Sequence, residues 1–295
     1  ELAQVSLLRE FFGVEAADAR QSFGYSIGEM AALIVSGVFT AEHLLPVPLA
    51  CAADCADLTE NSTVGVLFSR GPALPLTDVQ ALCCEISSEG LGMVGVSAYL
   101  SPNTAVLHGE GETLTRLAAA LPGPLPKTAA LRLKTHKLPP LHTPIVWQRN
   151  IPNRVATALY KIPGRLNPPD VKLLSCVTGE ASYDPGSARD LMVRWVDHPQ
   201  LLWNAIDETL RGGVDTLIHV GPGPNLIPAT FQRLGRNVEA ELNRSYFGRI
   251  GREFGSRVNR HAWLARLLPG RAALLRAPGV RHVILEDWLL EQESP

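Results

Sequence analysis

The sequence has few cysteines, little net charge and no long hydrophobic run. Five cysteines in 295 residues do not make a disulfide scaffold, and Cys51 and Cys55 have no second Cys or His pair to complete a zinc site. The formal net charge of −2 argues against a nucleic-acid-binding protein. The longest apolar stretch, 30–39, is interrupted by Ser36 and Gly37 and is too short to span a bilayer. We therefore expect no metal, no membrane span, no nucleic-acid partner and a reducing, cytoplasmic location.

Glycine and proline are also too scarce for a disordered chain, since together they make up 48 of the 295 residues. With 46% hydrophobic and 19% charged residues, the composition is that of a folded protein with one large domain or two smaller ones. The sequence opens with neither an initiator Met nor a basic segment before an apolar stretch. We expect it to be an excerpt of a longer protein.

The order of the expected elements predicts a mixed α/β fold with a small α+β subdomain inserted in a larger α/β body. Helical spacing of apolar residues predicts helices at Leu2–Phe12, Glu29–Ser36, Asp78–Ser87, Glu112–Leu121, Ala188–Val196 and Leu201–Gly212. Short apolar runs predict strands at Val64–Phe68, Met93–Tyr99, Thr104–His108 and Lys172–Val177, and a buried strand at Asp215–Val220. Two proline-broken regions, 122–140 and 163–169, punctuate the middle of the chain.

Residues 24–29, Gly-Tyr-Ser-Ile-Gly-Glu, fit the G-x-S-x-G pattern of a nucleophile elbow. The two glycines permit a sharp strand-to-helix turn that lifts the hydroxyl of Ser26 out of a sheet. The backbone N–H of the next residue, Ile27, then points at a developing oxyanion from the positive end of the helix. The pattern also fits an ordinary glycine turn, but the apolar helix that follows favours the elbow.

A serine nucleophile needs a base, and the chain offers eight histidines. His136 and His142 lie in a proline-rich loop that could hold an imidazole over a neighbouring site, and spacing alone does not choose between them. His219 precedes Gly221-Pro222-Gly223 at an expected strand end, where α/β sheets commonly bind ligands, but a partly exposed strand residue is an equal interpretation. The remaining five have no second feature and are expected to be solvated or structural: His43, His108, His198, His261 and His282.

Three ordered segments carry a resemblance to a known family: residues 24–29, Leu-His-Thr-Pro-Ile-Val at 141–146, and Val-Gly-Pro-Gly-Pro-Asn-Leu at 220–226. Residues 96–109 and 199–203 support it. The chain resembles the malonyl-CoA:acyl-carrier-protein transacylases and the acyltransferase domains of polyketide synthases over about residues 1–235. The resemblance implies an α/β-hydrolase-like core at 1–60 and 131–235 with a ferredoxin-like subdomain at 61–130. Residues 236–295 lie outside it and are expected to form an Arg-rich, helical C-terminal extension.

The same resemblance implies the site residues. Ser26 is the nucleophile, His142 is the base, oriented by a main-chain carbonyl, and Ile27 supplies a backbone oxyanion donor. Tyr25, Arg70 and Leu141 are expected to contact substrate.

The chain departs from the family pattern at three places. Tyr25 stands where the family usually has His. The family's N-terminal segment, which supplies a further oxyanion donor, precedes residue 1. An ungapped count places the family's carboxylate-binding Arg at Cys51, and no Lys or Arg lies between Ser26 and Arg70. Either another cation such as Arg70, Lys134 or Lys137 binds the carboxylate, or the substrate is an uncharged acyl group.

The function implied is S-acyl transfer, preferably of malonyl, from acyl-CoA through an acyl-serine to an acyl carrier protein, in fatty-acid or polyketide synthesis and with no cofactor. A serine esterase or thioesterase, and a non-catalytic carrier-docking module, are the alternatives. Residues 233–281 contain eleven Arg and three acids. Arg257, Arg260 and Arg266 are therefore expected either to be solvated or to dock an acidic carrier protein.

Overall fold

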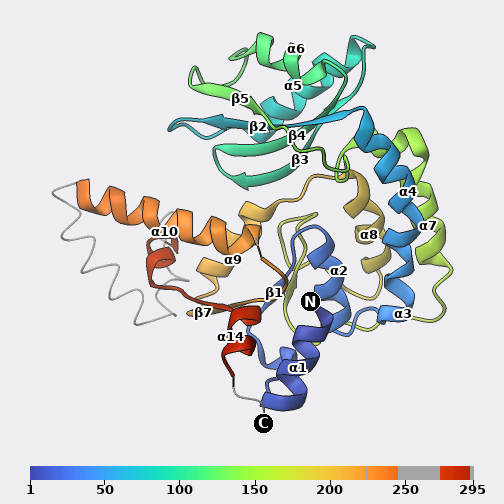
Figure 1. Ribbon diagram of the computed structural model, residues 1–295, viewed down its shortest axis with the longest axis vertical. Coiled ribbons are helices and arrows are strands. Elements are labelled where there is room, and N and C mark those ends of the chain that lie inside the picture. Colours follow the sequence, from blue (N-terminus) through green and yellow to red (C-terminus); the bar gives the residue numbers. More distant parts are fainter. Residues whose placement is uncertain (224, 245–272, 293–295) are drawn as a thin grey trace. The chain divides into compact units, whose positions relative to one another are not determined.

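The computed structural model describes residues 1–223, 225–244 and 273–292 (Figure 1). The chain forms two compact units, each built from separate stretches of sequence. Unit 1 comprises residues 1–36, 170–173 and 204–295, and unit 2 comprises residues 37–169 and 174–203. The sequence predicted three parts instead: a core at 1–60 and 131–235, a subdomain at 61–130 and an extension at 236–295. That division stays a prediction.

Unit 1 contains two small sheets with helices around them. Strand β1 (Ser22–Phe23) pairs with β6 (Leu173–Leu174), and β7 (Thr216–His219) pairs in parallel with β8 (Arg281–Ile284). The helices are α1 (Leu2–Phe12), α2 (Ile27–Val35), α9 (Leu202–Arg211), α10 (Leu226–Arg244) and α14 (Leu285–Glu291), with short 3-10 helices at Ala16–Asp18 and Leu274–Gly279. Helix α1 ends at Gly13, whose φ of 64° is the left-handed conformation that glycine adopts without steric cost.

The described residues after 272 are held to unit 1 by a buried arginine. The Arg276 side chain is 1% exposed, and its guanidinium donates to the carbonyls of Leu210 and Val214 and to the carboxylate of Asp215. Ring contact between Phe12 and Trp288, with centroids 4.7 Å apart, joins α1 to α14.

Unit 2 contains a four-stranded sheet in the order β3-β4-β2-β5, antiparallel throughout. Its strands are β2 (Ser62–Ser69), β3 (Val94–Ser101), β4 (Thr104–Glu110) and β5 (Ala129–Leu133), and α5 (Leu76–Ser88) and α6 (Thr113–Ala120) connect them in the sequence β-α-β-β-α-β. Helices α3 (Ala41–Leu44), α4 (Pro46–Glu60), α7 (Ile151–Tyr160) and α8 (Ala188–Asp197), with a 3-10 helix at Pro144–Arg149, complete the unit.

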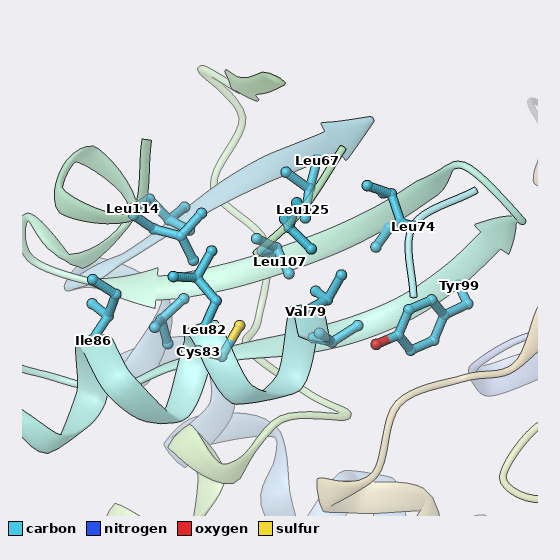
Figure 2. Close-up of a cluster of buried hydrophobic side chains, with 14 residues drawn as sticks. Leu67, Leu74, Val79, Leu82, Cys83, Ile86, Tyr99, Leu107, Leu114 and Leu125 are labelled. Atoms are coloured by element: carbon cyan, nitrogen blue, oxygen red, sulfur yellow. The ribbon is translucent and has the colours of Figure 1, made fainter. Parts of the chain in front are cut away.

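One face of this sheet packs against α5 and α6 through a cluster of buried side chains (Figure 2). Leu67 and Leu107 from the sheet meet Val79 and Leu82 from α5, and all four are at most 3% exposed. Burying each such side chain contributes about 1.5–3 kcal/mol. Because side chains alternate along a strand, the residues next to these point to the opposite face of the sheet, where the loop that carries His142 packs.

The expected mixed α/β fold is confirmed, and eleven expected elements correspond to described ones within a few residues. Several details were wrong. The strand expected at Lys172–Val177 is only β6, and β7 is not a buried strand, because Thr216 and Ile218 are exposed while His219 is buried. Helices α4 and α7 and strand β5 were missed.

The C-terminal extension is helical only in part, since residues 281–284 form the strand β8. The arginines of this extension were expected either to be solvated or to dock a carrier protein, and Arg276 does neither because it is buried. Arg257, Arg260 and Arg266 lie outside the described residues. Within the described part of the chain, no helix combines the length and apolar character needed to cross a membrane.

Candidate active site

The sequence around Ser26 forms a tight strand-turn-helix in unit 1. Strand β1 ends at Phe23, and α2 starts at Ile27, immediately after the serine. Ser26 has a φ of 55° and a ψ of −122°, a backbone conformation that a residue with a side chain adopts only under strain. Strain of this kind at a serine between a strand and a helix is the geometry of a nucleophile elbow.

Gly24 makes this elbow sterically possible. A Cβ at position 24 would lie 2.0 Å from the carbonyl oxygen of Gly28, so only glycine lets the end of β1 approach the first turn of α2. The amides of Gly28 and Glu29 donate to the carbonyls of Tyr25 and Ser26, which closes the turn. The N–H of Ile27, the first residue of α2, has no acceptor within the helix and lies at its positive end.

Ser26 lines a cavity of about 650 Å³ in unit 1. The walls come from β1 and the elbow, from one side of α2, from β7 with the following turn, from the start of α10, and from Glu1 and Val5 of the α1 region. Tyr25 and Ile27 also line it. Most of the lining is apolar, and the described residues that line it include neither Lys nor Arg.

His142 lies in unit 2, in the loop before the 3-10 helix at Pro144–Arg149. It is 4% exposed and has a left-handed φ of 64°. Its Nδ1 lies 2.6 Å from the carbonyl oxygen of Trp195, and its backbone N–H donates to the carbonyl of Val196 at 2.7 Å. Because a carbonyl only accepts, Nδ1 carries the proton and Nε2 is left with the lone pair that a general base needs.

Burial lowers the pKa of His142 to about 4, because the charged imidazolium loses its water. The hydrogen bond to the Trp195 carbonyl opposes this by raising the pKa, and positive charge on His108 would lower it further. The imidazole is therefore neutral at neutral pH and ready to accept a proton.

The structure separates the expected site residues between its units. Tyr25, Ser26 and Ile27 lie together in unit 1, and Leu141 and His142 lie together in unit 2. Leu141 is half-buried, and its carbonyl accepts a hydrogen bond from Ser97 at 3.1 Å.

The expected cations are all on the surface of unit 2. Arg70 and Lys134 are exposed, and Lys137 is exposed and ion-paired with Glu60 at 3.3 Å. His136, the other loop histidine, is exposed too.

Sequence reasoning left two groups unidentified. The resemblance implied that a main-chain carbonyl orients His142, but not which one, and the structure assigns this contact to Trp195. The second is a cation near Cys51, which is a buried, free thiol on α4 whose pKa burial raises. The cation is Arg154 on α7, which pairs with Asp54, one turn after Cys51 on α4, and donates to the carbonyl of Ala50. These residues are about 100 positions apart in sequence, so only the fold brings them together.

Among the described residues, no three His, Cys, Asp or Glu side chains are grouped to hold a metal ion.

No protein-family model matches the chain. The malonyl CoA-acyl carrier protein transacylase of Salmonella typhimurium is 26% identical over 224 residues, covering 75% of this chain and 68% of that protein. A 6-methylsalicylic acid synthase of Arthrobotrys oligospora is 26% identical over 243 residues, covering 79% of this chain but only 12% of that much longer protein.

Solved structures show the same fold. The MCAT structure from Streptococcus pneumoniae matches with a TM-score of 0.64 at 18% identity, covering 79% of this chain and 72% of that one. The malonyl CoA-acyl carrier protein transacylase from Clostridium perfringens matches with a TM-score of 0.61 at 21% identity, covering 78% and 67%. The mixed α/β architecture described above is therefore shared with these structures.

Proposed function

We propose that this chain is a member of the family of malonyl-CoA:acyl-carrier-protein transacylases and polyketide synthase acyltransferase domains, to which its relatives belong. In this proposal it transfers an acyl group, preferably malonyl, from coenzyme A to the phosphopantetheine thiol of an acyl carrier protein. Fatty-acid or polyketide synthesis is the pathway class, the cytoplasm is the proposed location, and no cofactor takes part.

The observation that carries the proposal is the strained backbone of Ser26 between β1 and α2, at the wall of the cavity. An ordinary glycine turn into a helix has no reason to hold a serine in this conformation. The second support is the orientation of His142, whose Nδ1 is occupied by a carbonyl and whose Nε2 is therefore the basic atom. The assignment of Ser26 as nucleophile and His142 as its base is part of the proposal.

In the first half-reaction, Nε2 of His142 takes the proton of the Ser26 hydroxyl while Oγ attacks the thioester carbonyl. The oxyanion of the tetrahedral intermediate is stabilised by the Ile27 N–H. The carbon–sulfur bond then breaks, the coenzyme A sulfur takes the proton from His142, and an acyl-serine ester remains.

The second half-reaction reverses these roles. His142 takes the proton of the carrier's phosphopantetheine thiol, and the sulfur attacks the ester carbonyl. The bond from the carbonyl carbon to Ser26 Oγ breaks, and Oγ recovers the proton. Because His142 is uncharged at the start of both halves, one residue serves as base and then as acid in each.

The finer fold assignment is also a proposal. The β-α-β-β-α-β order and the strand order β3-β4-β2-β5 support a ferredoxin-like subdomain in unit 2. The elbow between β1 and α2 supports an α/β-hydrolase-like core.

The preference for malonyl rests on the named relatives. A malonyl carboxylate in a closed pocket requires a cation. Arg70, Lys134 and Lys137 are exposed, Arg154 already pairs with Asp54, and the cavity beside Ser26 contributes none. The experiment below therefore compares acyl-CoA substrates with and without a carboxylate on the acyl group.

Intact-mass spectrometry after mixing the protein with malonyl-CoA, acetyl-CoA or a longer acyl-CoA tests the proposal. We expect an adduct of one acyl group that is absent from Ser26→Ala. An adduct that water removes within seconds identifies an esterase or thioesterase instead. Carrier binding without any adduct identifies a docking module. Equal yields from malonyl-CoA and acetyl-CoA contradict the malonyl preference.

A further inference from the structure

His108 lies on the face of the unit 2 sheet opposite α5 and α6. Its strand neighbour Leu107 belongs to the buried cluster on the helix side, and successive residues of a strand point to opposite faces. The same alternation in β3 places Val94 and Val96 in that cluster and Gly95 on the other face. His108 and Gly95 are cross-strand partners, so both occupy this second face side by side.

The loop that carries His142 packs on this second face. A Cβ at Gly95 would lie 2.7 Å from Cδ of Pro144 and 3.2 Å from Cβ of Thr143, so the loop touches the sheet at the position paired with His108. Two residues after Gly95 in β3, Ser97 donates a hydrogen bond to the carbonyl of Leu141. The residues on both sides of His142 are therefore fixed to the sheet beside His108.

His108 is a buried titratable side chain that the proposed reaction does not use. It is 3% exposed, and its Nδ1 is buried without a hydrogen-bond partner in the described residues. Buried polar groups are nearly always paired, so an unpaired imidazole nitrogen in a core calls for an explanation. A leucine at this position would bury more apolar surface and leave nothing unpaired.

Burial lowers the pKa of His108 to about 4, which matches that of His142, and a positive charge on His108 lowers the pKa of His142. The other ionisable groups nearby are engaged elsewhere. Glu110, on the same face of β4, accepts from the backbone N–H of Met93, and Asp197, at the end of α8, accepts from Trp147 and His198. Strand β2 offers Val64 opposite His108, which has no charge.

We propose that His108 is a positioning residue for His142, and that a proton on one of these two buried imidazoles disfavours a proton on the other. A proton on either ring disfavours a proton on the other, because both rings are buried and the repulsion between two buried positive charges is weakly screened. The ring that takes the first proton, such as the one that the reaction delivers to His142, therefore lowers the proton affinity of its neighbour. This inference rests on the proposed role of His142.

The test is the proton titration of His142 by NMR of ¹⁵N-labelled imidazoles, with the resonance assigned by His142→Gln. We expect His108→Leu and His108→Gln to raise the midpoint of His142 by about 0.5 pH unit, a roughly threefold increase in proton affinity, because neither replacement can be charged. His136→Leu, which removes an exposed imidazole from the same loop, is the matched control and should leave the midpoint unchanged. The acid side of the Ser26 acylation profile should shift by the same amount as the midpoint.

An unchanged His142 midpoint in both His108 variants overturns the inference and leaves His108 a packing residue. Should the leucine variant fail to fold, the glutamine variant decides, since it keeps the size and polarity of the side chain. The titration needs no turnover, so it separates the two proposals. A shifted His142 midpoint with no acyl adduct on Ser26 refutes the acyltransferase function and supports the coupling of the two histidines. An adduct with an unshifted midpoint supports the acyltransferase function and refutes the coupling.

Discussion

The two glycines of the Ser26 motif differ in what an added methyl group would meet. A Cβ at Gly24 would lie 2.0 Å from the carbonyl oxygen of Gly28 and 2.3 Å from the backbone nitrogen of Glu29. Both atoms belong to the first turn of α2, so no side-chain rotation can relieve the overlap. A Cβ at Gly28 would meet only the flexible carboxylate of Glu1, at 3.5 Å.

These contacts set the expected free energies of unfolding. Overpacking against movable side chains costs about 1–3 kcal/mol, so Gly24→Ala, which collides with backbone, should cost at least about 3 kcal/mol. Gly28→Ala lies inside α2, where Ala is favoured over Gly by about 0.8–1.0 kcal/mol, so it should be neutral or stabilising by up to that amount.

Urea unfolding of the two variants beside the parent measures both values, and labelling of Ser26 by a fluorophosphonate reports whether the elbow is intact. We expect Gly24→Ala to lose both stability and labelling and Gly28→Ala to keep both. Equal stability of the two variants would refute the elbow geometry, because it would mean that β1 does not approach the first turn of α2.

Three further predictions follow from the site and from the buried arginine. Ser26→Ala should abolish the acyl adduct, and His142→Ala should slow its formation by about 10²–10⁴-fold, whereas His136→Ala should have little effect. Rapid-quench mass spectrometry measures all three rates, and equal losses in the two histidine variants would overturn the assignment of His142 as the base. Because the pKa of His142 is lowered to about 4, the neutral base persists well below pH 6.5, and the acylation rate should fall only as the pH approaches 4. The stability contributed by the neutral ring should be lost as the pH falls from about 6.5 to 4. Stopped-flow pH profiles measure the rate and urea titrations the stability, and a rate loss centred near pH 6.5 contradicts the prediction. Arg276→Met should destabilise the protein by about 1–3 kcal/mol for each main-chain carbonyl left unpaired, while Asp215→Asn should change stability little because that carboxylate is 68% exposed. Thermal unfolding compares the two variants, and equal destabilisation would show that the ion pair matters and the carbonyl contacts do not.

Local signals in the sequence predicted much of the fold. Helix α1 and its Gly13 cap, strands β2, β3 and β4 and the elbow at Ser26 all depend on residues near one another in sequence. Strand β5 was missed because prolines at 122, 124 and 126 just before it signal a loop, although they precede the pairing residues 129–133 and take nothing from the ladder.

The parts that could not be predicted depend on long-range pairing. The carbonyl of Trp195 that orients His142 is 53 positions away, and any residue type could supply it. His108 looked like an ordinary strand residue, because its burial on the loop side of the sheet follows only from the register with Gly95. The strand at 281–284 looked helical because its parallel partner, β7, is about 60 residues earlier in the chain.

The central claim is that acyl-Ser26 donates to a thiol in preference to water. The direct measurement is to isolate the acyl-enzyme, add phosphopantetheinylated acyl carrier protein, and follow the acyl group on both proteins by intact mass. We predict that the label moves to the carrier thiol, and that Ser26→Ala neither acquires nor passes it on. Release of the acyl group as free acid at the same rate with and without carrier would contradict the claim.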